Sequence, residues 1–358
     1  MVNRRGYNYF LRGRFLGSIY QEVADKEFLS TCDRGIINKS EKRFILFTKM
    51  ASNDVEVVVK DTLSKVDKSF IIKPKQLEAI KNVVNKTDTL AILPTSYGKS
   101  LIYQLLPAVF KSLGFAANPV VIVISPLKSL IHNQISAAVK LSNCLGLTPS
   151  SLESISTEQL CSGKINLVID TPEAWLNDPN WCNALLSKFM RDNLICIVVD
   201  EAHLVSWGLP SHESEKAFRE AFSRISSLRS FCGENIPVLA LSAIVDQDLS
   251  HLISSCCGLS KTLKTIYTTS NRENIRLSLV KLKSKDHNCF QWVFDQIRDN
   301  GADCPKILVY CRTQRMVGWH YEKFLVALKK DAFKDKKKDN ENLLVGMYHS
   351  CSLDINEF

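Results

Sequence analysis

Short apolar runs recur along the chain, separated by stretches with helical periodicity. Seven runs have the length and composition of buried strands: TLAIL (89–93), VVIVI (120–124), INLVI (165–169), ICIVV (195–199), PVLAL (237–241), KILVY (306–310) and LLVGMY (343–348). Continuous apolar strands that alternate with helices are typical of a parallel sheet covered by helices on both faces. We therefore predict an α/β fold, with the first five runs in one sheet and the last two beginning a second.

The composition narrows the class of protein. The 358 residues include 46 Lys and Arg against 37 Asp and Glu, a net charge of +9. No apolar run approaches the ~20 residues of a membrane-spanning helix, so we predict no membrane partner. The twelve cysteines are scattered and include no C-x-x-C pair, which argues against a zinc site and a disulfide framework. We interpret the chain as an intracellular protein.

The first apolar run leads into a loop that favours phosphate binding. TLAIL is followed by PTSYGKS (94–100) and then by LIYQLLPAVF, a good helix. This strand–loop–helix order is typical of a P-loop, although Leu93 replaces its first glycine. We expect Lys99 to reach the β- and γ-phosphates of a nucleotide and Ser100 to ligate magnesium. The loop residues expected around the phosphates are Thr95, Ser96, Tyr97, Gly98, Lys99 and Ser100. An ordinary helix start with a lysine in its first turn is the alternative.

An acidic pair follows the fourth run, about a hundred residues later. ICIVV ends in Asp200-Glu201-Ala202-His203, at the end of a buried parallel strand where ligands bind in such sheets. We expect Asp200 to hold magnesium, Glu201 to deprotonate the attacking water and His203 to belong to the same catalytic set. A helix N-cap with a solvated neighbour is the alternative interpretation.

These motifs, in this order, resemble those of superfamily 2 helicases, and within them the RecQ-like DNA helicases, over residues 70–350. FIIKPKQLEAI (70–80) is similar to the adenine-reading motif of that family, which implies that Gln76 and Lys73 bind ATP. LALSAI (239–244) is similar to the motif that couples the ATP state to lobe movement, through Ser242 and Ala243. SNRENIR (270–276), VYCRTQ (309–314) and MYHS (347–350) also match. The cofactors implied are ATP and magnesium.

The resemblance also implies contacts with nucleic acid. VISPLKSLIHNQ (123–134) and TPE (171–173) are similar to motifs that line the path of a single strand. RecQ-like enzymes place an aromatic-rich loop after the acidic box, and stacking there contributes ~1–3 kcal/mol per base. The alternative for its aromatic residues, including Phe222, is packing in the core. The residues expected to contact DNA are Ser125, Pro126, Leu127, Thr171, Trp207, Phe218 and Arg219.

The motif spacing divides the chain into three parts. Residues 1–60 are unassigned, 61–266 form an ATP-binding RecA-like lobe, and 267–358 form part of a second RecA-like lobe. The sequence contains no Q-x-x-G-R-x-G-R, the motif that carries the arginine finger of the family. We therefore interpret the chain as a fragment or part of a longer helicase, which binds ATP but hydrolyses it weakly at most.

The function implied is an ATP-dependent, 3′→5′ DNA helicase that acts on single-stranded and duplex DNA in the nucleus. Three alternatives stay open. One is a non-motor module that binds ATP and nucleic acid, the second is an RNA helicase with a D-E-A-H box, and the third is a small-molecule P-loop kinase.

Overall fold

The computed structural model describes two compact units, which divide between Arg272 and Glu273. Each unit is described by itself. The described residues are 52–66, 71–126, 131, 134–135, 165–210, 216–233, 235–269, 271, 274–279, 281, 287–334, 336 and 339–348.

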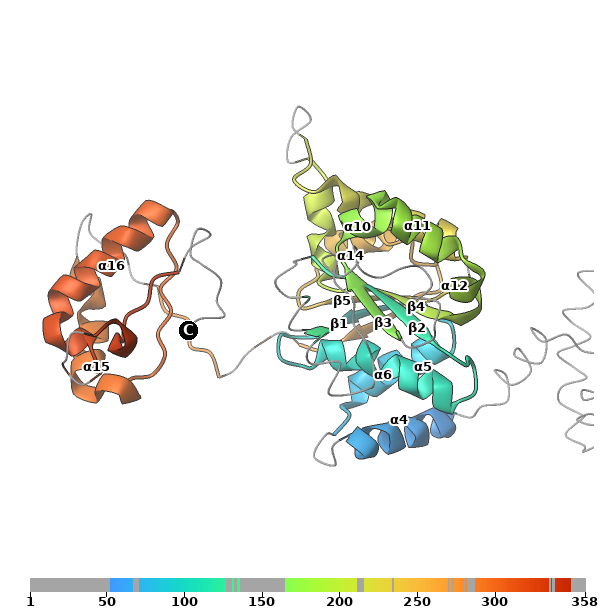
Figure 1. Cartoon of the computed structure of the whole chain (residues 1–358), viewed down its shortest axis with the longest axis horizontal. Helices are drawn as coiled ribbons and strands as arrows, with labels where there is room; N and C mark the ends of the chain where they lie inside the picture. The colour runs from blue at the N-terminus through green and yellow to red at the C-terminus, as the bar shows by residue number, and fades with distance from the viewer. Residues whose placement is uncertain are drawn as a thin grey trace, which may run out of the picture. The chain divides into compact units, whose positions relative to one another are not determined.

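The first unit contains a six-stranded parallel sheet (Figure 1). The strand order is β3-β2-β4-β5-β1-β6, and every neighbouring pair is parallel. The strands are β1 (Thr89–Ile92), β2 (Val120–Ile124), β3 (Leu167–Asp170), β4 (Leu194–Val199), β5 (Val238–Ser242) and β6 (Lys264–Tyr267). The first five apolar runs are therefore strands, as predicted. The sequence did not reveal β6, an edge strand in which only Ile266 is buried.

Helices cover both faces of this sheet, as Figure 1 shows. The helices are α4 (Ser52–Val66), α5 (Pro74–Val84), α6 (Lys99–Ser112), α10 (Pro172–Asn177), α11 (Pro179–Leu186), α12 (Lys188–Asn193), α13 (Ser227–Cys232) and α14 (Gln247–Cys256). Helices α4, α5 and α6 pack on one face, and the other helices pack on the opposite face. In β2, Val121 and Val123 contribute to the first core, while Ile122 and Ile124 contribute to the second. Because both faces are covered, the strand is apolar throughout.

The topology decides which loops meet. Strand β5 lies between β4 and β1, and β2 lies on the other side of β4. All four strands run in the same direction, so the segments that follow them emerge at one edge of the sheet. The P-loop, the acidic pair, Ser242 and Ser125 therefore gather at this edge.

In the second unit, the two predicted strands are wrong. Its helices α15 (Gln291–Asn300) and α16 (Gln314–Leu328) pack around Val293, Ile297, Phe324 and Leu328. The runs at 306–310 and 343–348 form no strand, and within the described residues their only bridge joins Leu343 to Phe333. A strand needs a partner for its backbone N–H and C=O groups, and no described segment supplies one here.

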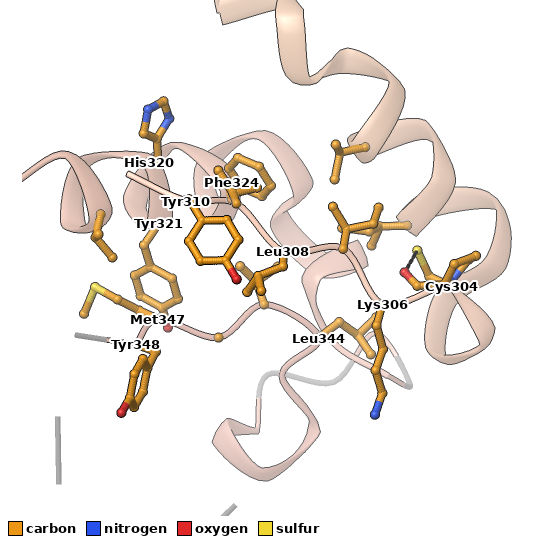
Figure 2. Close-up of a pocket in the computed structure, with 18 of the residues that line it drawn as sticks. Cys304, Lys306, Leu308, Tyr310, His320, Tyr321, Phe324, Leu344, Met347 and Tyr348 are labelled. Carbon is orange, nitrogen blue, oxygen red and sulfur yellow. Dashed lines mark hydrogen bonds between the residues drawn. The ribbon is translucent and has the colours of Figure 1, made fainter. Parts of the chain in front are cut away.

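The two runs instead line a cavity of about 510 Å³ in the second unit (Figure 2). Leu308 and Tyr310 come from the first run, Met347 and Tyr348 from the second, and Phe324 from α16. The side chain of Tyr310 is 88% exposed and that of Leu308 is 74% exposed. Apolar side chains that a sheet would bury are thus open to solvent.

Candidate nucleotide and nucleic-acid site

The loop between β1 and α6 contains two residues with a left-handed backbone. Gly98 has φ +90° and directly precedes α6, and Ser96 also has a positive φ of 66°. A Cβ on residue 98 would lie 2.6 Å from Nε2 of Gln76. Position 98 therefore requires glycine both for its left-handed backbone and for its close approach to Gln76.

Lys99 lies at the start of α6 and points toward the acidic pair. Its side chain is buried, with Nζ 3.4 Å from the carbonyl oxygen of Leu93 and 3.9 Å from Oε1 of Glu201. Ser100, the next residue, is half-buried. Lys99 and Glu201, which are about a hundred positions apart in the sequence, thus form an ion pair, because β1 and β4 end at the same edge of the sheet.

Gln76 holds the start of α5 against the P-loop. Its Oε1 accepts a hydrogen bond from the backbone N–H of Lys73, and its Nε2 donates to the carbonyl oxygens of Tyr97 (3.1 Å) and Gly98 (2.8 Å). Nζ of Lys73 also donates to the Tyr97 carbonyl, at 2.9 Å. The amide expected to read adenine is therefore in direct contact with the loop expected to bind phosphate. Pairing with a base requires it to exchange these hydrogen bonds.

Asp200 lies at the end of β4 with a side chain that is only 5% exposed. Burial, followed by the charge of Glu201, raises the pKa of Asp200 to about 6. Its Oδ1 accepts a hydrogen bond from the N–H of Glu201, and its Oδ2 accepts one from Nε2 of Gln134. Glu201 has φ +48°, an uncommon conformation for a residue other than glycine.

The donor set at this edge fits magnesium. Mg²⁺ prefers oxygen ligands, and the Asp200 carboxylate and the Ser100 hydroxyl supply them. A divalent cation beside Asp200 would also offset the cost of a buried negative charge.

His203 joins the acidic box to the end of β5. Its Nδ1 lies 3.1 Å from Oγ of Ser242 and 3.5 Å from Oε2 of Glu201. Burial lowers the pKa of His203, so the imidazole is neutral at pH 7. Oγ of Ser242 also donates to the carbonyl oxygen of Ile244, and Ala243 between them is half-buried. Ser242, one of the two residues expected to couple ATP state to movement, is thus linked to Glu201 through His203.

Arg219 connects the segments that were expected to contact DNA. Its Nε donates to Oε1 of Glu173 at 2.8 Å, its Nη2 donates to Oε2 of the same residue, and its Nη1 donates to the carbonyl oxygen of Pro126. Although burial opposes it, Arg219 keeps the pKa of Glu173 below its ordinary value. The guanidinium therefore ties the aromatic-rich loop to the segments after β2 and β3.

The aromatic residues of that loop divide into a buried and an exposed group. Phe222 is buried in the core, in agreement with the alternative interpretation. Phe218 is 77% exposed, and half-buried Trp207 lies between the two, with ring centroids 5.4 Å from Phe218 and 6.2 Å from Phe222. Phe218 is therefore available for stacking, and Trp207 is only partly so.

The other residues expected to contact DNA are mainly buried. Ser125 is fully buried, and its N–H donates to the Asp170 carbonyl. Thr171 is also buried, and its hydroxyl caps α10 by accepting the N–H of Ala174 at 3.4 Å. Leu127 lies outside the described residues.

Three residues of the site were not predicted from the sequence. Gln134 and Glu173 lie inside the motifs that we identified, but their partners, Asp200 and Arg219, are distant in sequence. Gly208 ends the 3₁₀ helix η1 (Ala202–Gly208), where a Cβ would lie 2.4 Å from the backbone nitrogen of Ser223. In the sequence, the only sign of such a close approach between two backbone segments is the glycine itself.

Two negative findings apply to the described residues. In the ranges that the structure describes, no three His, Cys, Asp or Glu side chains cluster closely enough to hold a metal ion. No described helix is long and apolar enough to span a membrane.

The fold matches that of a solved helicase. The structure of the DUF1998 helicase MrfA bound to DNA and AMPPNP superposes with a TM-score of 0.54 at 16% identity, covering 76% of this chain and 38% of that one. Identity this low shows similarity of fold alone.

Relatives at higher identity carry helicase names. The chain is 30% identical over 276 residues to the putative ATP-dependent DNA helicase Q1 of Caenorhabditis elegans, covering 74% of this chain and 40% of that protein. It is 31% identical over 231 residues to the RecQ-like DNA helicase BLM of Xenopus laevis, covering 62% of this chain and 16% of that protein. The chain thus spans less than half the length of these relatives.

The DEAD/DEAH box helicase model matches residues 73–252, which contain the P-loop and the acidic box. The chain belongs to the DEAD/DEAH box helicase family.

Proposed function

We propose that this chain is the ATP-binding part of a RecQ-type DNA helicase that couples ATP hydrolysis to 3′→5′ translocation on single-stranded DNA and to duplex unwinding. The observation that carries this proposal is the contact between the P-loop and the acidic box. Lys99 lies 3.9 Å from Glu201, and Ser100 and Asp200 follow strands that end at the same edge. The names of the relatives, which include ATP-dependent DNA helicases similar over most of this chain, support the same reaction.

The chemistry assigned to the site is phosphoryl transfer to water. The N–H groups of the P-loop and the N-terminus of α6 hold the phosphate chain, and Lys99 neutralises charge on the β- and γ-phosphates. Ser100 and Asp200 hold magnesium, which when bound neutralises charge that develops on the phosphate oxygens. Glu201 orients the attacking water and accepts its proton.

The contact between His203 and Ser242 transmits the state of this site. His203 lies between Glu201 and Ser242, and Ser242 holds the Ile244 carbonyl. A change in the position of Glu201 on loss of the γ-phosphate moves this chain of contacts. The segment after β5 is thereby the first structure outside the site to respond.

DNA contacts are assigned to the aromatic-rich loop and to the segments after β2 and β3. Exposed Phe218 and half-buried Trp207 stack on unpaired bases. Arg219 holds Pro126 and Glu173 beside them, so the loop moves together with the proposed strand path. We place the protein in the nucleus, where the substrate DNA of a eukaryotic RecQ-type helicase is found.

The expected activity of this chain is low. An arginine finger contributes roughly 10³–10⁵ to the rate of such reactions, and the motif that carries it is not in this sequence. The experiment is a steady-state ATPase assay of the purified chain with and without a single-stranded oligonucleotide. We expect slow hydrolysis, which Lys99→Ala abolishes. Fast turnover that is stimulated by DNA would show that the chain is more active than proposed, and hydrolysis unaffected by Lys99→Ala would show that another site is responsible.

A non-motor module that binds ATP and nucleic acid is the second candidate. The observation in its favour is the second unit, whose two apolar runs form no sheet within the described residues. An oligonucleotide that binds with the same affinity whether ATP or ADP is present would favour this candidate.

A further inference from the structure

The side chain of Gln134 contacts the carboxylate of Asp200. Its Nε2 donates to Oδ2 of Asp200 at 2.9 Å. The reverse orientation of the amide would place Oε1 against a carboxylate oxygen, and two acceptors repel each other. The contact with an ionised Asp200 therefore fixes which way the amide faces.

Within the part of the chain that the structure describes, each oxygen of the Asp200 carboxylate accepts one hydrogen bond from the protein. Oδ1 accepts the backbone N–H of Glu201, which follows it in the chain, and Oδ2 accepts Gln134. Among the described residues, Gln134 is thus the side chain from outside the acidic box that donates a hydrogen bond to the Asp200 carboxylate. Each oxygen retains a lone pair for a further ligand.

The backbone of Gln134 is also anchored close to the P-loop. Its carbonyl oxygen accepts a hydrogen bond, long at 3.5 Å, from Nε2 of Gln104. Gln104 is a buried residue of α6, the helix that begins with Lys99. Gln134 therefore lies between the helix of the phosphate site and the carboxylate of the magnesium site.

Half of the Gln134 amide is unused. Its Oε1 is buried and, within the described part of the chain, has no hydrogen-bond partner. A buried acceptor without a donor is destabilising, and such groups are rare in folded proteins. Oε1 is thus available to a donor such as a magnesium-bound water, while Nε2 holds Asp200.

We propose that Gln134 is a positioning residue that orients Asp200 for magnesium. This inference rests on the proposed function, because it assigns magnesium to Asp200. The side chain of Gln134 donates to Oδ2 of Asp200 while the backbone N–H of Glu201 donates to Oδ1, so the two donors together fix the rotation of the carboxylate.

The test is a magnesium titration of nucleotide binding. Binding of a fluorescent ATP analogue to the full chain is measured at increasing Mg²⁺ for the unchanged protein, Gln134→Met and Gln291→Met. Met has nearly the shape of Gln but no N–H, so Gln134→Met removes the donor to Asp200. We expect the Mg²⁺ concentration for half-maximal binding to rise about 10-fold or more, since loss of a partner that orients a metal ligand costs 10–100-fold in affinity.

The pattern across Mg²⁺ concentrations distinguishes positioning from general damage. At saturating Mg²⁺, the Gln134→Met protein should bind the analogue as tightly as the unchanged protein. Gln291→Met, the matched control, removes a similar amide donor to a carboxylate, Asp295, in the second unit and should leave the Mg²⁺ dependence unchanged. Gln134→Asn keeps the amide on a side chain that is one methylene shorter, so it should give an intermediate shift in the Mg²⁺ dependence. It provides a second variant if Gln134→Met does not fold.

Two different failures can be separated. A Mg²⁺ dependence that is the same in Gln134→Met, Gln134→Asn and the unchanged protein would overturn the role of Gln134 alone. If the unchanged protein binds the analogue no better than Lys99→Ala at any Mg²⁺ concentration, the proposed function fails and the inference fails with it.

Discussion

Strand β2 and the run at 306–310 have almost equally apolar sequences, VVIVI and KILVY, but only the first lies in a sheet. In the first unit, β2 has β3 on one side and β4 on the other. In the second unit, no described segment pairs with 306–310, and Leu308 is 74% exposed where Ile122 is fully buried. An apolar run therefore predicts a strand only where the rest of the unit supplies its neighbours.

The two units also differ in how their polar groups are held. In the first unit, buried Asp88 accepts hydrogen bonds from Arg229 and from the N–H groups of Val238 and Ser260. These contacts join residues from 141 to 172 positions apart. In the second unit, the ion pairs of Arg298 with Asp295 and of Lys336 with Asp331 lie on a more exposed surface, where such pairs contribute about 0–1 kcal/mol. The first unit should thus respond more strongly to substitution.

The largest effect is expected for Arg229→Met. The variant leaves the Asp88 carboxylate buried without its charged partner, which should destabilise the first unit by about 3–5 kcal/mol. Hydrogen exchange should accelerate across β1 and β5, while the second unit, at 287–334, is unaffected. Equal acceleration in both units would mean that they unfold together and would break the comparison.

A matched pair of leucine-sized truncations should differ between the units. Ile122→Ala leaves a cavity in a fully packed sheet and should cost about 2–5 kcal/mol, whereas Leu308→Ala removes an exposed side chain and should change stability by less than about 0.5 kcal/mol. Chemical denaturation, followed by exchange in each unit, measures both values. A cost for Leu308→Ala as large as that for Ile122→Ala would show that 306–310 is packed in solution.

Two Gly→Ala substitutions should change stability in opposite directions. Gly208→Ala forces a Cβ against the backbone of Ser223 and should cost about 1–3 kcal/mol. Gly318 lies inside α16 of the second unit with no atom within 4 Å of its ideal Cβ, so Gly318→Ala should stabilise that helix by about 0.5–1 kcal/mol. Thermal unfolding of the two variants gives the signs directly. A neutral Gly208→Ala would show that η1 is free to move away from Ser223.

The smallest expected effect is the loss of stability at acidic pH. Burial opposes ionisation of Asp88, but Arg229 and two backbone N–H groups outweigh it and lower the pKa below its ordinary value of 3.8. Since the folded pKa is the lower one, this stabilisation is complete above about pH 4 and is lost as the pH falls through the folded pKa. Acid titration of the first unit should therefore show a loss of stability below pH 4 that Asp88→Asn reduces. The same loss in Asp88→Asn would assign the titration to other carboxyl groups.

The sequence predicted most of the first unit because its signals are local. Five strands follow from their apolar runs, and the P-loop and acidic box follow from the order of strand, loop and helix. The edge strand β6 was missed because only one of its four residues is buried. The contacts of Gln134 with Asp200 and of Arg219 with Glu173 could not be predicted, because they depend on which strands are neighbours. In the second unit, the runs were apolar enough for strands, but a sequence does not show whether a partner is present.

The most direct test of this account is hydrogen exchange with and without Mg²⁺ and a non-hydrolysable ATP analogue. If the loops after β1 and β4 form one nucleotide site, residues 94–103 and 199–204 should both exchange more slowly when the analogue is bound, while 306–348 do not change. Lys99→Ala should weaken binding by about 10–100-fold, because a hydrogen bond to a charged group contributes about 1.5–3 kcal/mol, and should abolish the protection at equal ligand concentration. Protection of only one of the two loops, or protection that persists in Lys99→Ala, would contradict the account.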